Sequence, residues 1–262
     1  GAGESVTVRF GNNPNIISVA ANANGLFTTQ FTVDTQPYAG KDIVGYGNTT
    51  QQSATSTVFS IQANIIEFIP TIGTVGTILT IKGTGFKSGS ARINIADHVA
   101  AKVFTANLSG YFEISMTICD HPYGTHTIKT YSAGNIPWVE RLFKIIPDIY
   151  FVSPSLGTVG NIITINGKGY SFNEQIEINF GTTKTVTTTT AIGVESNGHG
   201  GSFTTTFTVN KQQFGTTTIT GWGLVSNDSG TNTFMIRARM FDVAPVNGTI
   251  RSWVTIKGDG YK

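Results

Sequence analysis

The stretch PTIGTVGTILTIKGTGF, from Pro70 to Phe86, decides the fold because the chain repeats it. Residues Pro154–Tyr170 read PSLGTVGNIITINGKGY, and residues Pro245–Tyr261 read PVNGTIRSWVTIKGDGY. The copies begin 84 and then 91 residues apart, from the differences 154 − 70 and 245 − 154. A period of this length indicates tandem structural units that share one fold.

The glycines of this stretch first suggest a phosphate-binding loop. Such a loop needs a helix directly after the glycines, because the N-terminus of that helix binds the anion. Here GTGF is followed by KSGSARINI, which reads as a turn and another strand. We therefore interpret the glycines as residues of tight turns between strands, with backbone angles that other residues avoid.

Two further blocks recur in the same phase. One reads GLFTTQFTV from Gly25, GYFEISMTI from Gly110 and GSFTTTFTV from Gly201, and the other reads VTVRFG, ARINIA and IEINFG. Within the blocks apolar and polar residues alternate: Leu79 and Ile81 oppose Thr80, and Phe27 and Phe31 oppose Thr28. Roughly seven such runs in each period predict tandem immunoglobulin-like β-sandwiches, an all-β fold.

Composition agrees with this fold and excludes several classes of function. Charged residues make up 12% of the 262 residues, the net charge is +2, and the 17 Lys and Arg are scattered, so we expect no nucleic-acid partner. The single cysteine, Cys119, excludes an intrachain disulfide. No apolar run reaches membrane-spanning length, so we expect no membrane insertion in this segment.

The repeated stretch reads P-x-x-G-x-x-G-x-x-(I/V)-T-I-x-G-x-G-(F/Y), and a strand that ends in FG follows it. This pattern resembles the IPT/TIG family of Ig-like domains, and the resemblance covers essentially the whole chain. Two positions depart from it: Arg251 replaces the second glycine of the third turn, and one copy reads NIA instead of NFG. The resemblance implies an early-type Ig sandwich of extracellular surface proteins, of spacers in some carbohydrate-active enzymes and of certain DNA-binding factors. It implies no catalytic residue. We expect that the chain is not an enzyme and that it has no cofactor.

The family's domain begins just before the proline, and this sets the expected boundaries. We expect a partial Ig-like domain over 1–63 without its first two strands, a domain over 64–147, a domain with an inserted loop over 148–238, and two strands of a further domain over 239–262. The joints contain no Gly/Ser linker, which predicts a stiff rod. Apolar residues at the joints, such as Ile65 and Ile149, either bury an interdomain contact or belong to each domain's own core.

A piece of two strands buries little by itself, and a sandwich without two strands exposes core and sheet edges. Two explanations stay open. The chain is a window on a longer tandem array, or the last strands of one molecule complete the first sandwich of the next by β-strand addition. In both cases the partner is the chain itself, as a head-to-tail homopolymer or as its own continuation. We favour the repeating assembly, because the missing and the surplus strands match to within a residue.

The segment CDHPYGTH holds weak candidates for a metal site, Cys119, His121 and His126, because a thiolate and imidazoles suit zinc or copper. Other copies lack these side chains and have Asp34, Gln36 and Lys41, or Asn210, Gln212 and Thr217. One copy in three is poor support for an essential site, so we predict an ordinary turn and no bound metal.

Several residues are candidates for contact with a partner. Tyr46, Tyr131 and Trp222 occupy one equivalent position; they either stack on sugar rings or a neighbouring chain, or pack inside the domain. The loop Ala191–Ser202, which contains His199, breaks the periodicity, and such insertions often bind partners. Four sequons are candidate glycosylation sites, although such triplets also arise by chance in a chain rich in Thr and Asn: Asn48, Asn107, Asn227 and Asn247.

These observations favour an extracellular or cell-surface structural protein whose tandem repeats form a fibre, stalk or surface layer. The first alternative is an adhesin or carbohydrate-binding module that uses the aromatic residues or the glycine-rich loop, with glycans as partners. The second alternative is a spacer region of a larger surface enzyme. DNA binding ranks last, because Lys and Arg do not cluster.

Overall fold

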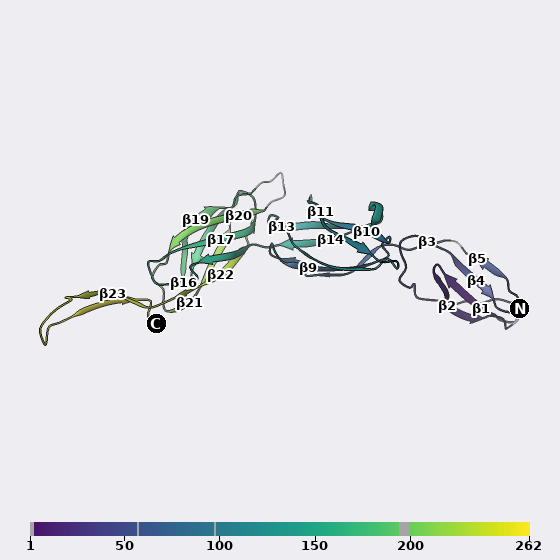
Figure 1. The fold of residues 1–262 in the computed structure, drawn as a ribbon, viewed down its shortest axis with the longest axis horizontal. Coiled ribbons are helices and arrows are strands. Elements are labelled where there is room, and N and C mark those ends of the chain that lie inside the picture. Colours follow the sequence, from purple (N-terminus) through teal and green to yellow (C-terminus); the bar gives the residue numbers. More distant parts are fainter. Residues whose placement is uncertain (1–2, 57, 97, 194–199) are drawn as a thin grey trace. The chain divides into compact units, whose positions relative to one another are not determined.

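The computed structural model describes residues 3–56, 58–96, 98–193 and 200–262 (Figure 1). These residues form β-strands, one short 3-10 helix, Ala133–Asn135, and no α-helix. The predicted all-β architecture of Ig-like sandwiches is therefore confirmed, and the helix that a phosphate loop needs does not follow the glycine motif in the part of the chain described. None of the described helices has the length and apolarity to cross a membrane.

The chain divides into two compact units. One unit comprises Gly1–Ile69, Leu79–Met116 and Thr127–Arg141, and the other comprises Pro70–Ile78, Thr117–His126 and Leu142–Lys262. The first unit contains the N-terminal sandwich, and the second contains the third sandwich and the C-terminal hairpin. Strands of the middle sandwich are found in both.

The third sandwich, drawn in green in Figure 1, shows a complete repeat. Its smaller sheet has the strand order β15-β17-β20, and its larger sheet has the order β16-β22-β21-β18-β19. Its strands are β15 (Asp148–Ser153), β16 (Leu156–Gly157), β17 (Ile162–Tyr170), β18 (Gln175–Phe180), β19 (Thr183–Thr190), β20 (Gly201–Thr208), β21 (Gly215–Gly223) and β22 (Ser229–Ile236).

The core of this sandwich follows from the alternation in the sequence. Ile163 and Ile165 of β17 and Ile176 and Ile178 of β18 are fully buried, while the residues between them face outward. Each large aliphatic side chain that is fully buried stabilises the fold by roughly 1.5–3 kcal/mol. Ile149, which lies at a joint, belongs to this core cluster, so the structure places it in its own domain's core.

The middle sandwich repeats the plan. Its sheets have the orders β12-β9-β7 and β11-β10-β13-β14-β8. Its strands are β7 (Asn64–Ile69), β8 (Ile72–Gly73), β9 (Ile78–Thr84), β10 (Gly89–Ile95), β11 (His98–Ala106), β12 (Phe112–Thr117), β13 (Gly124–Tyr131) and β14 (Trp138–Ile145). The alternation predicted for β9 is confirmed, because Leu79 and Ile81 are fully buried and Thr80 is not.

The two glycines of the repeated G-x-G have different roles, and the expected turn role applies only to the second. Gly85 and Gly169 have φ values of 70° and 74°, which favour glycine. Gly167 has no such φ value; a Cβ there would overlap the ring of Phe203, which packs directly on its backbone. The first glycine therefore makes room for an aromatic ring of the neighbouring strand.

The N-terminal sandwich has one substantial sheet, of order β2-β1-β4-β5, and a short pair, β3-β6. Its strands are β1 (Ser5–Phe10), β2 (Asn13–Ala20), β3 (Gly40–Lys41), β4 (Ile43–Gly47), β5 (Ser53–Thr55) and β6 (Phe59–Ser60). Phe10 is fully buried and packs on Phe31 and Phe59, with ring centroids 5.4 and 5.6 Å away. Among the residues described, this sandwich has no counterpart of the sheet β15-β17-β20.

The chain's last described element is the hairpin of β23 (Arg239–Ala244) and β24 (Thr255–Asp259), the yellow ribbon in Figure 1. These two strands form a sheet of their own. A third strand, such as β20 provides for β15 and β17, is not paired with them in the described part of the chain.

A candidate strand-accepting groove and an unpaired hairpin

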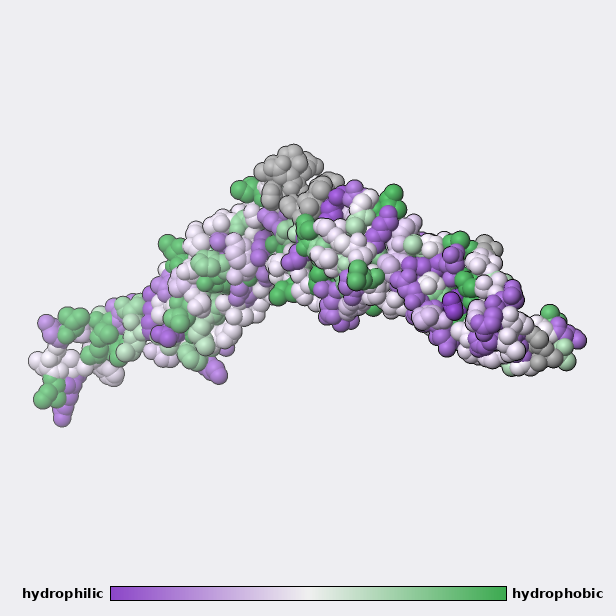
Figure 2. Space-filling view, turned by 45° about the vertical axis from the view of Figure 1, so that its right-hand side comes forward, coloured by the Kyte–Doolittle hydropathy of each residue, from purple (hydrophilic) through white to green (hydrophobic). Residues whose placement is uncertain are grey.

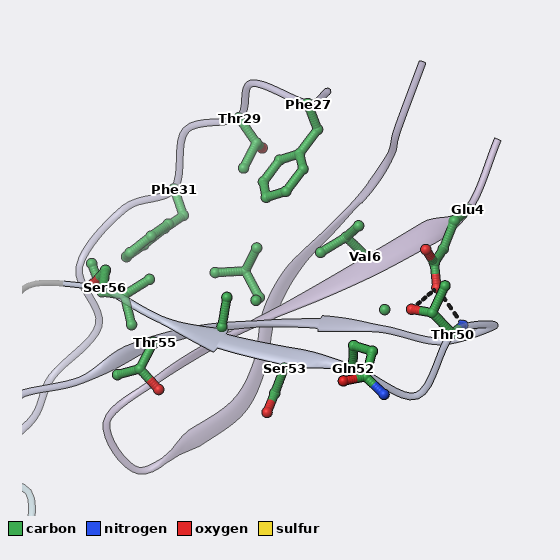
Figure 3. Close-up of a pocket in the computed structure, with 15 residues that line it drawn as sticks. Glu4, Val6, Phe27, Thr29, Phe31, Thr50, Gln52, Ser53, Thr55 and Ser56 are labelled. Atoms are coloured by element: carbon green, nitrogen blue, oxygen red, sulfur yellow. Dashed lines mark hydrogen bonds between the residues drawn. The ribbon is translucent and has the colours of Figure 1, made fainter. Parts of the chain in front are cut away.

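An open apolar groove lies on the N-terminal sandwich, with a cavity volume of about 540 Å³. Its floor is formed by inward side chains of β1 and β4, including Val6, Val8 and Ile43. Its wall is the segment of residues 25–33, from which Phe27 and Phe31 point toward the floor (Figure 3). The groove is thus lined by side chains of the kind that form a sandwich core.

The segment of residues 25–33 differs from the strand that the alternation predicts. Its equivalents are the strands β12 and β20, yet here the chain forms no strand. Phe27 is 44% exposed, whereas the equivalent Phe112 and Phe203 are 3% and 4% exposed. The physical reason is the lack of a neighbour: β12 pairs with β9 and β20 with β17, while the described residues offer this segment no such strand.

The hairpin has the geometry of the strand pair that the groove lacks. In β23–β24 Val243 faces Ile256, as Val152 faces Ile165 in β15–β17. Both pairs carry a register shift at the same place, before Asp242 and before Phe151. The turn is also kept: Arg251 has a φ of 75°, close to the 87° of the equivalent Gly160. The sequence departure at Arg251 therefore leaves the shape of the turn unchanged.

The core side chains of the hairpin are exposed. Val254, Ile256 and Tyr261 are 52%, 58% and 55% exposed. Their equivalents in the third sandwich, Ile163, Ile165 and Tyr170, are all 0% exposed. Figure 2 shows hydrophobic side chains, in green, over the hairpin at the left of the view. Exposed apolar surface that is contiguous in this way is typical of an interaction site.

In both the third and the N-terminal sandwich, a buried carboxylate holds a turn at the end of the larger sheet. Glu174 is 0% exposed and accepts the N–H groups of Ser171 and Val225, both at 2.8 Å. Glu4, its equivalent at the rim of the groove, accepts the N–H of Thr49 at 3.0 Å and that of Thr50 at 2.6 Å. The turn beside the groove is therefore held in the same way as the turn of the complete sandwich.

The three equivalent aromatic residues lie on the outer face of their sheets and are not core residues. Arg9 lies 5.1 Å from the ring centroid of Tyr46, and Arg92 lies 4.8 Å from that of Tyr131. Trp222 is 38% exposed. Tyr46 and Tyr131 are half-buried, and each of the three aromatic residues lies on the strand that pairs with β1, β10 or β18.

Of the candidate metal ligands, Cys119 and His121 lie in the turn before β13, and His126 lies in β13 itself. The Sγ atom of Cys119 is 3.3 Å from Nδ1 of His121, and the ring centroids of His121 and His126 are 5.3 Å apart. His126 Nε2 is 2.8 Å from the carbonyl oxygen of Pro122. The described residues contain no group of three or more His, Cys, Asp and Glu side chains placed to hold a metal ion.

The remaining candidates lie at the surface or outside the described part. The four sequon asparagines, Asn48, Asn107, Asn227 and Asn247, are all exposed. His199 lies outside the described residues. At the base of the inserted loop, Gly200 is buried, and a Cβ there would overlap the backbone of His121. Sequence reasoning missed the buried carboxylates of Glu4 and Glu174 and the Tyr170 hydroxyl. The sequence feature that could have indicated them is the G-x-G at Gly45–Gly47 and Gly221–Gly223, of whose glycines Gly47, Gly221 and Gly223 lie against these groups.

No family model and no curated protein matches the chain. The solved structures that are similar to it include the following three. The BSP domain of a biofilm-associated protein has 14% identity, covering 82% of this chain and 44% of that chain, with a TM-score of 0.24. The N-terminal eight Ig domains of Down Syndrome Cell Adhesion Molecule have 10% identity, covering 97% and 40%, with a TM-score of 0.26. The full extracellular region of plexin A4 has 12% identity, covering 94% and 27%, with a TM-score of 0.26. The chain thus spans less than half the length of each of these three chains.

Proposed function

We propose that the chain is a structural protein of the cell surface or extracellular space, with IPT/TIG-like repeats, that assembles head to tail. In this proposal the hairpin β23–β24 of one molecule enters the open groove of the N-terminal sandwich of the next. One observation carries the proposal: the hairpin exposes the side chains that are buried in the complete sandwiches, and the groove lacks those same two strands. The function is mechanical and needs no catalytic residue.

The third sandwich supplies the register of the docked hairpin. There Phe203 lies opposite Gly167, Thr205 opposite Ile165 and Phe207 opposite Ile163. Transfer of this register places Gly258 opposite Phe27, Ile256 opposite Thr29 and Val254 opposite Phe31. Residues 25–33 then become a strand of a three-stranded sheet, which is the usual result of β-strand addition.

Docking of the hairpin is favourable for two reasons. Val254, Ile256 and Tyr261 lose exposed apolar surface, which contributes on the order of 1 kcal/mol or more for each side chain. The backbone of residues 27–33, which makes no backbone hydrogen bond among the described residues, gains a ladder of them with β24. The same step covers the exposed backbone edge of β24, and an uncovered edge of this kind can pair with strands of other chains.

The test is the assembly state of the full chain and two matched variants. Val254→Glu changes a side chain that would point into the groove in the docked state, because the equivalent Leu79 and Ile163 are fully buried in their sandwiches. Trp253→Glu changes its neighbour, which faces outward, because the equivalent Ile78 and Ile162 are 65% and 67% exposed. We expect concentration-dependent oligomers or fibres, by light scattering and electron microscopy, for the wild type and Trp253→Glu, and monomers for Val254→Glu.

Two results would contradict the proposal. One is a wild-type chain that stays monomeric at high concentration. The other is an equal loss of assembly in both variants. Trp253 is 93% exposed and faces outward, so an equal effect of its substitution would indicate that the chains associate through exposed hydrophobic surfaces and not through strand pairing. If a longer chain with a preceding repeat fills its own groove, the extended chain will be monomeric where the present chain associates.

A carbohydrate-binding or adhesive role is the second candidate, and the exposed aromatic residues favour it. Tyr131 and Trp138 have ring centroids 6.5 Å apart, Trp138 is 51% exposed, and Trp222 is 38% exposed. Aromatic faces of this kind stack on sugar rings. Binding on a glycan array that is lost in Trp222→Ala or Trp138→Ala, with the fold retained, would support this role; equal binding by both variants would exclude these platforms.

A further inference from the structure

We propose that Tyr261 and Gly45 determine which strand the groove accepts, and that they fit it to the hairpin of a second copy of this chain. This inference rests on the proposed function and names its partner. It concerns one position, where the aromatic residue that ends the repeated motif meets a residue of the opposite sheet.

The third sandwich shows how a tyrosine is accommodated at this position. The Tyr170 hydroxyl donates a hydrogen bond to the Gly221 carbonyl oxygen at 3.0 Å and accepts one from the Gly230 N–H at 3.3 Å. Tyr170 is 0% exposed. A Cβ on Gly221 would lie 2.7 Å from the hydroxyl oxygen, so a tyrosine here requires a glycine opposite it.

The middle sandwich shows the other solution. Its aromatic residue is Phe86, which has no hydroxyl and is 0% exposed. The residue equivalent to Gly221 is Thr130, which pairs with Ile93 as Gly221 pairs with Ile178, and it is 2% exposed. The repeat therefore uses two matched combinations, tyrosine with glycine and phenylalanine with threonine.

The groove and the hairpin provide the two residues of the tyrosine–glycine combination. Gly45 pairs with Val8 as Gly221 pairs with Ile178, so it is the equivalent of Gly221. The nearest atom to a Cβ on Gly45 is Cγ1 of Val6, at 3.7 Å, so the space for a hydroxyl is open. Tyr261 is the equivalent of Tyr170 and is 55% exposed. In the docked state its hydroxyl donates to the Gly45 carbonyl oxygen and accepts the N–H of Ala54, the equivalent of Gly230.

This match selects the occupant of the groove. A hairpin of the Phe86 type would leave a gap beside Gly45 and lose both hydrogen bonds. A hairpin with tyrosine fills the site, and Tyr261 of a second copy provides it. The arrangement excludes hairpins of the phenylalanine type through a difference in affinity, which is the usual source of specificity.

A defined pair of chains makes this inference measurable. A full chain with Val254→Glu can only accept a hairpin, and a full chain with Phe31→Glu can only donate one, so their mixture stops at a 1:1 complex. Tyr261→Phe is then placed in the donor chain and Gly45→Thr in the acceptor chain. Far-UV circular dichroism and the melting temperature of each chain check that it is folded.

We expect Tyr261→Phe alone to weaken the complex about 10-fold, because buried hydrogen bonds are lost. Gly45→Thr alone should weaken binding of the tyrosine donor at least 100-fold, because its Cβ meets the hydroxyl. The two changes together should bind more tightly than Gly45→Thr alone, because they recreate the pair of Phe86 and Thr130. This rescue is the decisive readout.

The outcomes separate the two proposals. If the unmodified pair binds and the double change shows no rescue, the specificity inference is wrong and head-to-tail assembly stands. If the unmodified pair does not bind, assembly itself is wrong. A second measurement within one chain guards against misfolded variants: Tyr170→Phe with Gly221→Thr should recover unfolding stability that Gly221→Thr alone loses, and its failure to do so also overturns the specificity inference.

Discussion

Ile165 and Ile256 occupy the same place in the repeat, yet Ile165 is 0% exposed and Ile256 is 58% exposed. The difference lies in the strand beside them, because β17 pairs with β20, whereas β24 pairs only with β23 among the residues that the structure describes. A two-stranded hairpin is at best marginally stable in water. The unassembled chain should therefore open first at this hairpin.

Trypsin tests this expectation. In a Phe31→Glu chain, which has no working groove, we expect rapid cleavage after Arg251 and Lys257, both of which are exposed. Lys82, the equivalent of Lys257 in the complete middle sandwich, should resist cleavage in the same sample. Assembled wild-type chains should protect all three sites. Resistance of Arg251 and Lys257 in the unassembled chain would show that the hairpin is stable alone.

Tyr170→Phe should destabilise the third sandwich by about 1–2 kcal/mol, because it removes the hydrogen bonds to Gly221 and Gly230. Burial raises the pKa of Tyr170 above its ordinary value. The folded state thus keeps a proton that the unfolded state loses near pH 10, so this contribution is complete below pH ~10 and is lost as the pH rises further. Denaturant unfolding at several pH values should show the wild type losing more stability above pH ~10 than the variant. Parallel curves would contradict this role of the hydroxyl.

Glu174→Gln should lower the free energy of unfolding by about 2–3 kcal/mol. Its carboxylate is buried and accepts N–H groups of Ser171, Val225 and Ser226, and a carboxamide nitrogen cannot accept them. Glu177→Gln is the matched control, because Glu177 lies three residues after Glu174, on β18, and is only half-buried. Equal, small effects of the two substitutions would show that the carboxylate does not hold the turn.

Part of this fold could be predicted from local sequence. Strict alternation identified Leu79 and Ile81 as inward residues, and the structure confirms it. Alternation failed for residues 25–33, because a strand needs a partner as well as a pattern. The same nine-residue pattern forms β12 and β20 where a neighbour is present. Strand pairing depends on residues that are distant in the sequence. The repeat indicated that residues 25–33 have no neighbouring strand only because the first copy lacks two strands that the other copies have.

The groove and hairpin were foreseeable as the ends of an incomplete repeat, but their chemistry was not. The bond between Tyr170 and Gly221 joins residues 51 positions apart, and only the register of the sheets brings them together. The role of Gly167 was also hidden, because a glycine that makes room for a ring and a glycine that permits a turn look alike in the sequence. Burial of Glu174 likewise depends on loops that periodicity does not describe.

Gly167→Ala should destabilise the third sandwich by about 1–3 kcal/mol, because the added methyl group overlaps the Phe203 ring and overpacks the core. Thr164→Ala, an outward position on the same strand, is the control and should change the stability little. Phe203→Leu combined with Gly167→Ala should recover part of the loss. If Gly167→Ala unfolds like the wild type, the close approach of ring and backbone is not what selects glycine here.

The Cys119 thiol should react slowly with alkylating reagents at neutral pH. Burial raises the pKa of this thiol, and His121, only 3% exposed, covers one side of it. The thiolate is the reactive form, so the alkylation rate should keep rising with pH beyond the ordinary thiol value of about 8.5. A rate that levels off near pH 7 would instead indicate a thiolate stabilised by the histidine. Zinc retained by the purified wild type and lost in His121→Ala would likewise contradict the prediction that this turn binds no metal.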